Sequence, residues 1–200
     1  YAEELGYKIK LLGIAKSNNT DVEIRVHPTL VPEKRLVANV DGPMNAVLVH
    51  GNMVGPTLYY GAGAGAEPTA SAVVADVIDI ARQTKLSNKT LIPPLGFMPD
   101  MIYEKNILSI ENIFSEYYLR FTMKNQAGLL AKITNIFADH EISINSMVHK
   151  EVQENNQNPD IFLITSKTKE ADIDTIISEI ELLPENIEKV VKIRTEELSK

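Results

Sequence analysis

The sequence predicts an α+β protein made of two different parts. Residues 7–61 contain four stretches with strand-like alternation, and residues 67–83 then repeat apolar side chains at helical spacing. Residues 117–195 alternate strand and helix patterns in the order βαββαβ, which is typical of a ferredoxin-like domain. We therefore expect one domain over residues 1–83, a linker over residues 84–116 and a second domain over residues 117–200.

Composition excludes several classes of protein. The chain has 200 residues, 44% of them hydrophobic, and a formal net charge of -7 with acids and bases interspersed. Without a basic stripe to neutralise phosphates, nucleic acid is not an expected partner. The absence of cysteine rules out disulfides and thiolate sites, and the four histidines show no metal-ligand spacing. No apolar run reaches the roughly 18 to 20 residues of a membrane span, so we expect a cytoplasmic protein without a membrane partner.

Two alternating stretches open the first part, residues 7–16 and 22–31, on either side of the turn "SNNTD". The second stretch alternates three apolar with three polar residues: Val22, Ile24 and Val26 against Glu23, Arg25 and His27. This alternation predicts a pair of antiparallel strands with one face in water. "MNAVLVHG" and "MVGPTLYYG" predict a further hairpin, with "GN" at residues 51 and 52 as the turn.

The second part has a regular pattern of strands and helices. We expect strands at residues 117–124, 142–152, 161–166 and 187–195. Two helices between them are indicated by apolar residues at helical spacing, Leu129, Leu130, Ile133, Ile136 and Phe137 in one and Ile173, Ile176, Ile177 and Ile180 in the other. Both helices should lie on one face of the sheet. A second copy or a neighbouring domain should cover the other face, so we expect a homo-oligomer, at least a dimer.

Three glycines, Gly61, Gly63 and Gly65, precede the helix of the first part. They resemble a nucleotide-binding turn, but a dinucleotide fingerprint needs G-x-G-x-x-G and then a strand that ends in an acid, which "QTKLSNKTLIPPLG" does not supply. Two interpretations stay open. The glycines either permit a tight turn between strand and helix, or bring backbone NH groups to a cofactor that another domain holds.

Particular stretches of sequence resemble known families. "NVDGPMNAV" and "GAGAGAEPTASAVVAD" are similar to stretches of homoserine dehydrogenases, within a resemblance that covers about residues 1–83. "MKNQAGLLAKITNIFADHEISINSMVH" resembles the front of an ACT domain, a small amino-acid-sensing module. Monofunctional homoserine dehydrogenases commonly carry such a domain in this place.

The resemblance implies a function. The family interconverts L-aspartate 4-semialdehyde and L-homoserine with NAD or NADP, on the path to threonine and methionine. It implies that residues 7–60 belong to a dimerisation and substrate-binding sheet, and that Gly65 and Gly63 approach the nicotinamide end of the cofactor. The family's cofactor fingerprint and catalytic residues would lie upstream, in a domain that mainly holds the cofactor. We therefore expect no catalytic residue in this chain and no hydride transfer by the chain alone.

The turn "NQAG" and the helix after it form the candidate effector site. Backbone NH groups at a helix start suit an amino acid's carboxylate, and the resemblance implies an effector there, with threonine expected. The candidates are Asn125, Ala127, Gly128, Leu129 and Leu130, with Asn145 and Ser146 on the following strand. Asn125 and Ala127 stand where the family often has Asp and Pro. Two alternatives remain: Gly128 only permits a tight turn, or the chain is a non-catalytic sensing or dimerisation module.

Overall fold

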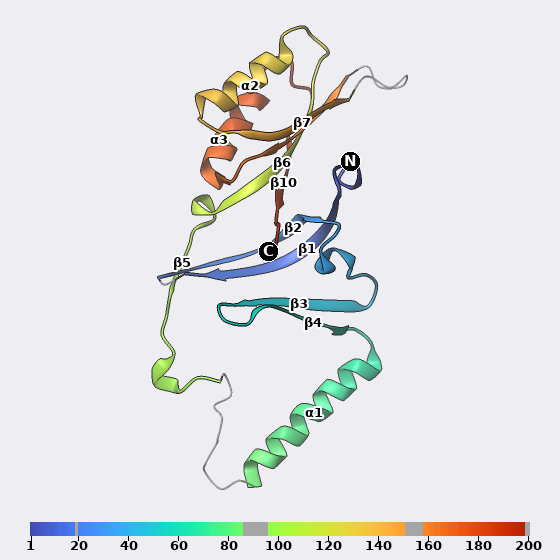
Figure 1. The fold of residues 1–200 in the computed structure, drawn as a ribbon, viewed down its shortest axis with the longest axis vertical. Helices are drawn as coiled ribbons and strands as arrows, with labels where there is room; N and C mark the ends of the chain where they lie inside the picture. Colours follow the sequence, from blue (N-terminus) through green and yellow to red (C-terminus); the bar gives the residue numbers. More distant parts are fainter. Residues whose placement is uncertain (19, 86–95, 151–157, 199–200) are drawn as a thin grey trace. The chain divides into compact units, whose positions relative to one another are not determined.

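The computed structural model describes residues 1–18, 20–85, 96–150 and 158–198 (Figure 1). The chain divides into two compact units. The first joins Tyr1–Ala38 to Asn106–Lys200, and the second is Asn39–Lys105.

One mixed sheet runs through the first unit, with strands in the order β1-β2-β10-β6-β8-β7. Its bounds are β1 Tyr7–Ser17, β2 Asp21–Pro32, β6 Phe114–Thr122, β7 Ile144–Lys150, β8 Asp160–Thr165 and β10 Val191–Thr195. Two short strands attach beside this path, β5 (Asn106–Ile107) on β2 and β9 (Thr168–Lys169) on β6. Short 3-10 turns lie at Glu3–Leu5 and Ile110–Asn112.

The βαββαβ prediction for the carboxyl-terminal part is confirmed. Helix α2 (Leu129–Asp139) follows β6, and helix α3 (Glu170–Glu181) precedes β10 (Figure 1). Their apolar faces meet one face of the sheet, where the buried core contains Tyr117, Leu119, Phe121 and Leu163 from strands and Ile133, Phe137, Ile173, Ile176 and Ile180 from helices. Burial of these side chains, rather than helix propensity alone, stabilises such short helices.

The amino-terminal residues of the same chain cover the opposite face of this sheet. Tyr118, Phe162 and Ile164 point to that side and pack with Leu30 in a second buried cluster. Tyr1 adds its ring, with its centroid 4.2 Å from that of Phe162. Over this cluster, the expected cover is therefore the neighbouring amino-terminal part of the same chain, the second of the two alternatives.

Strand β2 joins the two sequence regions. It pairs with β1 in an antiparallel register from Tyr7–Pro32 to Ser17–Val22, and with β10 in a short parallel ladder. The backbone N–H of Glu196 extends this ladder by donating to the carbonyl of Leu30 at 3.0 Å. Residues from the start and the end of the chain thus share one set of backbone hydrogen bonds.

The prediction that the polar face of β2 lies in water is wrong. Arg25 and His27 are buried, at 5% and 9% exposure, whereas Ile24 and Val26 are 54% and 71% exposed. The alternation itself is correct, but its direction is reversed. The polar side chains turn inward because the carboxyl-terminal part supplies partners for them within the first unit.

The second unit contains a hairpin and a long helix. Strands β3 (Met44–Gly51) and β4 (Gly55–Ala62) pair along their whole length, as the "GN" signal predicted. Helix α1 (Ala66–Lys85) follows directly and exposes Val73, Val74, Val77 and Ile78. With these elements, the predicted fold class, a strand-rich segment with one helix followed by a ferredoxin-like domain, is confirmed.

Candidate functional site

The glycines of the expected cofactor turn lie between β4 and α1, in the second unit. Gly63 and Gly65 are both exposed there, and Gly65 has a φ of 121°, which an L side chain rarely adopts. A Cβ on Gly63 would clash with the side-chain amide of Asn45. Gly63 also donates its N–H to the carbonyl of Pro43 at 3.3 Å. The two glycines thus bring bare backbone to the amino end of a 20-residue helix, an arrangement that suits an anionic or polar ligand group.

The expected effector turn lies between β6 and α2, in the first unit. Gly128 stands at the start of α2 in the left-handed region, with a φ of 83°, and no atom lies within 4 Å of the position a Cβ would take. Asn125 and Ala127 are exposed in the turn, while Leu129 is buried and Leu130 is 38% exposed. Leu129 therefore anchors the helix start in the core, and the turn before it faces solvent.

The remaining two predicted residues lie on β7. A register shift between Ile144 and Ser146 marks a bulge, and Asn145 is the residue inside it. The Asn145 amide donates to the carbonyl of Thr165 at 3.2 Å, so this side chain is engaged within its own sheet. Ser146 pairs with Ile164 across the ladder and is exposed.

Glu185 is a candidate that sequence reasoning missed. It follows α3, is 5% exposed, and lies beside the effector turn, where the N–H of Lys124 donates to its carbonyl at 2.9 Å. Its carboxylate pairs with Lys132 of α2, and its second oxygen, Oε2, is buried without a hydrogen-bond partner. The Lys132 ammonium lowers the pKa of Glu185. The Glu185 carboxylate thus lies against α2, paired with Lys132, whereas Asn125 in the turn carries no charge. No local pattern could indicate it, because Glu185 is about sixty residues from the turn in sequence.

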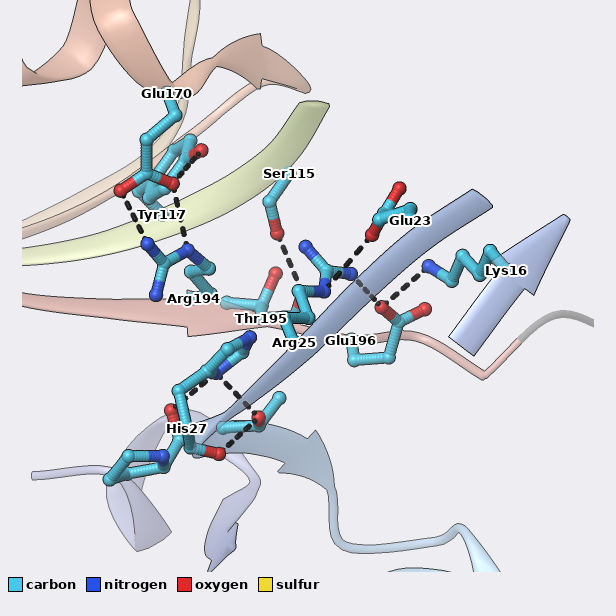
Figure 2. A network of polar contacts seen from close by, with 12 residues as sticks. Lys16, Glu23, Arg25, His27, Ser115, Tyr117, Glu170, Arg194, Thr195 and Glu196 are labelled. Atoms are coloured by element: carbon cyan, nitrogen blue, oxygen red, sulfur yellow. Dashed lines mark hydrogen bonds and ion pairs between the residues drawn. The ribbon is translucent and has the colours of Figure 1, made fainter. Parts of the chain in front are cut away.

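A buried polar network is a second group that the sequence did not indicate (Figure 2). At its centre, Glu170 is 2% exposed and accepts hydrogen bonds from Tyr117 Oη at 2.8 Å, Arg194 Nε at 2.7 Å and Lys192 Nζ at 2.6 Å. Burial alone would raise the pKa of Glu170, but these three donors outweigh it and lower the pKa. Tyr117 responds oppositely: burial and its bond to Glu170 raise the pKa of its hydroxyl.

Figure 2 also shows a second group of polar contacts, around β2. Arg25 forms ion pairs with Glu23 at 3.0 Å and with Glu196 at 2.8 Å, and Glu196 also accepts from Lys16 at 2.7 Å. His27 Nδ1 lies 3.0 Å from Thr29 Oγ1, and burial lowers the pKa of His27, with Arg194 and Arg25 adding to the effect. Arg25 is thus buried among charged partners, while Lys16 at the edge of the group stays half exposed.

Within residues 1–18, 20–85, 96–150 and 158–198, no group of three or more His, Asp or Glu side chains could hold a metal ion. In the same part of the chain, no helix combines the length and the apolar character that a bilayer crossing requires.

Comparison with known proteins identifies two regions. Residues 1–78 match the family model for homoserine dehydrogenase, and residues 117–185 match the model for the ACT domain. A homoserine dehydrogenase of Neisseria gonorrhoeae is 48% identical over 198 residues, which cover 99% of this chain and 45% of that protein. One from Pseudomonas aeruginosa is 45% identical over 199 residues, which cover 100% and 46%.

Solved structures agree. The crystal structure of a homoserine dehydrogenase from Thiobacillus denitrificans matches with a TM-score of 0.89 at 52% identity, covering all of this chain and 44% of that one. A Staphylococcus aureus homoserine dehydrogenase matches with a TM-score of 0.62 at 27% identity. This chain therefore spans less than half the length of the relatives it matches. These matches show that the chain belongs to the homoserine dehydrogenase family, as its carboxyl-terminal region followed by an ACT domain.

Proposed function

We propose that the whole protein is a cytoplasmic oxidoreductase that interconverts L-homoserine and L-aspartate 4-semialdehyde with NAD or NADP, in the synthesis of threonine and methionine. The family match over residues 1–78 supports this reaction. In this proposal the described residues do not perform hydride transfer. Gly63 and Gly65 instead present backbone at the start of α1 to the nicotinamide end of a cofactor that another domain mainly holds.

The proposed role of the ACT domain is to bind an amino-acid effector, threonine, at the start of α2. The observation that carries this proposal is the exposed turn in which Gly128, at a φ of 83°, opens the helix beside the buried carboxylate of Glu185. The effector's carboxylate would meet the NH groups of Gly128, Leu129 and Leu130, with Asn125 and Ala127 at the rim. The Leu129 N–H donates to the Gln126 carbonyl at 3.3 Å in this structure and would exchange that bond for the ligand. Asn145 and Ser146 would line the site from β7, and Glu185 would favour the effector's ammonium group.

Regulation would pass through the sheet of the first unit. Strand β2 belongs to the family region and β10 to the carboxyl-terminal domain. The two share backbone hydrogen bonds and are joined by the ion pair between Arg25 and Glu196. An effector can shift activity only if it binds two states with different affinity. A change in how β10 lies against β2 would supply those two states. We also propose a homo-oligomer, at least a dimer.

Thermal unfolding of the 200-residue chain with threonine, methionine, isoleucine, lysine and homoserine tests the effector site. A ligand present at a hundred times its dissociation constant adds about 2.7 kcal/mol of stability. We expect a threonine-selective rise in melting temperature that Gly128→Val abolishes.

Gly6→Val is the matched control. Gly6 lies in the same unit, also has a positive φ (77°), and also has no atom within 4 Å of its Cβ position. Both variants should therefore lose about 1 to 3 kcal/mol from backbone strain, but Gly6→Val should keep the ligand-induced shift. If Gly128→Val keeps the threonine-induced rise in melting temperature, the effector does not bind at this turn. If none of the five amino acids produced a shift, the tail would be an assembly domain without an effector.

A further inference from the structure

A pocket of about 290 Å³ lies in the first unit, away from the effector turn. Its walls come from four segments: Lys16 at the end of β1, Phe114 to Glu116 at the start of β6, Lys167 after β8, and Thr195 to Glu197 at the end of β10. The effector turn follows the opposite end of β6. Nine residues of extended strand span about 27 Å, so the pocket is a separate place on the domain.

The charges around this pocket are not balanced. Three carboxylates, those of Glu116, Glu196 and Glu197, line it with two ammonium groups, those of Lys16 and Lys167. Lys16 is already bound to Glu196 at 2.7 Å, and Glu196 also pairs with Arg25 at 2.8 Å. Lys167 is therefore the one lining cation that remains to offset both Glu116 and Glu197.

The state of Glu116 agrees with this excess of negative charge. Burial raises the pKa of Glu116, and the neighbouring Glu197 and Glu196 raise it further. A hydrogen bond from Thr195 Oγ1, 3.3 Å from its carboxylate, and the charge of Lys167 act in the opposite direction without cancelling the rise. A cation placed between Glu116 and Glu197 would relieve this repulsion.

We propose that the pocket binds a small metabolite through its primary ammonium group, held between the carboxylates of Glu116 and Glu197. An ammonium is a compact cation with three donors, and Thr195 offers a further oxygen beside the two carboxylates. The volume lies near the lower end of small-ligand pockets, which begin at about 300 Å³, so the ligand is small. The Phe114 ring forms an apolar wall, and Lys167 can accept a carboxylate if the ligand is an amino acid.

The two lysines that line the pocket disfavour a divalent metal ion compared with an ammonium group. Calcium takes about six to eight oxygen ligands, and a lysine ammonium in that shell would repel it. A ligand bound here would touch β1 together with β6 and β10, and so contact both of the regions that the sheet joins.

Titration calorimetry of the 200-residue chain tests the proposal with four probes: 1,4-diaminobutane, glycine, glutarate and calcium chloride. We expect heat from the diamine or from glycine at millimolar concentration, and none from glutarate or calcium. Glu116→Gln combined with Glu197→Gln should weaken that binding by about tenfold or more, because hydrogen bonds to charged groups are lost. Glu188→Gln, an exposed glutamate in the same unit that does not line the pocket, is the matched control and should change nothing.

Further variants identify the class of ligand and separate it from the effector. If the ligand is an amino acid, Lys167→Met should weaken the binding of glycine and leave the binding of the diamine unchanged. If the ligand is a simple amine, the variant should bind both probes as the parent chain does. Gly128→Val should not affect either probe. The proposal is overturned if no ammonium probe binds, if the double variant binds as well as the parent chain, or if calcium binds in its place.

Discussion

Glu170 is a buried carboxylate at the first residue of α3. A carboxylate at 2% exposure is unfavourable unless it is paired and hydrogen-bonded, and here Tyr117, Lys192 and Arg194 all donate to it. It also lies in the first turn of a helix, where negative charge is favoured. Its removal would leave the half-buried Arg194 without this carboxylate partner and Lys192 paired with Asp174 alone.

We predict that Glu170→Gln lowers the free energy of unfolding by about 3 kcal/mol at pH 7, as expected when one member of a buried ion pair is lost. The sign of the pH dependence follows from the lowered pKa. Glu170 contributes stability above its ordinary pKa of 4.5, and that contribution disappears as pH falls through the lower folded value. Urea denaturation of the parent and the variant measures this. A difference as small as that of the surface control Glu188→Gln would contradict the prediction.

His27 makes the stability of the protein depend on pH in a second range, nearer to neutrality. Its pKa is lowered by burial, so the unfolded chain takes up a proton near the ordinary value of 6.5 while the folded chain resists. Stability from a neutral His27 is therefore present above that pH and is lost as pH falls below it. We predict that His27→Gln shows a flatter stability profile between about pH 7 and 5 than the parent chain. Parallel profiles for the two chains would show that His27 titrates as it does when unfolded.

The main lesson at the scale of elements is the reversed face of β2. Period-two alternation predicted the strand and its partner, but alternation cannot tell which face is inside. Which face is buried depends on Arg194, Glu196 and the sheet of the carboxyl-terminal part. These are far from β2 in sequence and contact it only in the folded protein. In contrast, α2, α3 and their strands could be predicted, because the apolar repeats that define them also form the core that stabilises them.

A substitution on β2 tests this junction. Leu30 is fully buried between Tyr118, Phe162 and Ile164, so Leu30→Ala should lower the free energy of unfolding by about 2 to 5 kcal/mol. Leu11→Ala, on the paired strand β1, should cost little because Leu11 is 72% exposed. Chemical denaturation of both variants gives the comparison. Equal, small losses would mean that the amino-terminal strands do not pack against the carboxyl-terminal sheet.

The candidate site could be predicted only in part. Gly128 and the start of α2 follow from a short local motif, and the structure places them as expected at an exposed turn. Glu185 could not be found from sequence, because only the folded chain brings it beside the turn, where Met123 and Asn186 form a β-bridge. Asn145 was selected for its position on the next strand, yet its amide bonds to Thr165. Local sequence predicts backbone turns better than it predicts which distant side chains join them.

At the scale of the whole molecule, the first unit combines residues from both family matches. Residues 1–38 and 106–200 form one compact unit, although the first belongs to the dehydrogenase match and most of the second to the ACT match. Their shared sheet, the cluster around Leu30 and the ion pair between Arg25 and Glu196 hold them together in this unit. We therefore expect a ligand bound to one region to stabilise backbone in the other.

Amide hydrogen exchange of the 200-residue chain, with and without saturating L-threonine, tests this account most directly. We predict slower exchange at the start of α2, where the N–H of Lys132 donates to Gly128, and also where the N–H of Glu196 donates to Leu30 between β10 and β2. Protection confined to α2 would leave an effector site without coupling to the family region. Identical exchange in every segment, with threonine and with the other amino acids of the panel, would contradict the account.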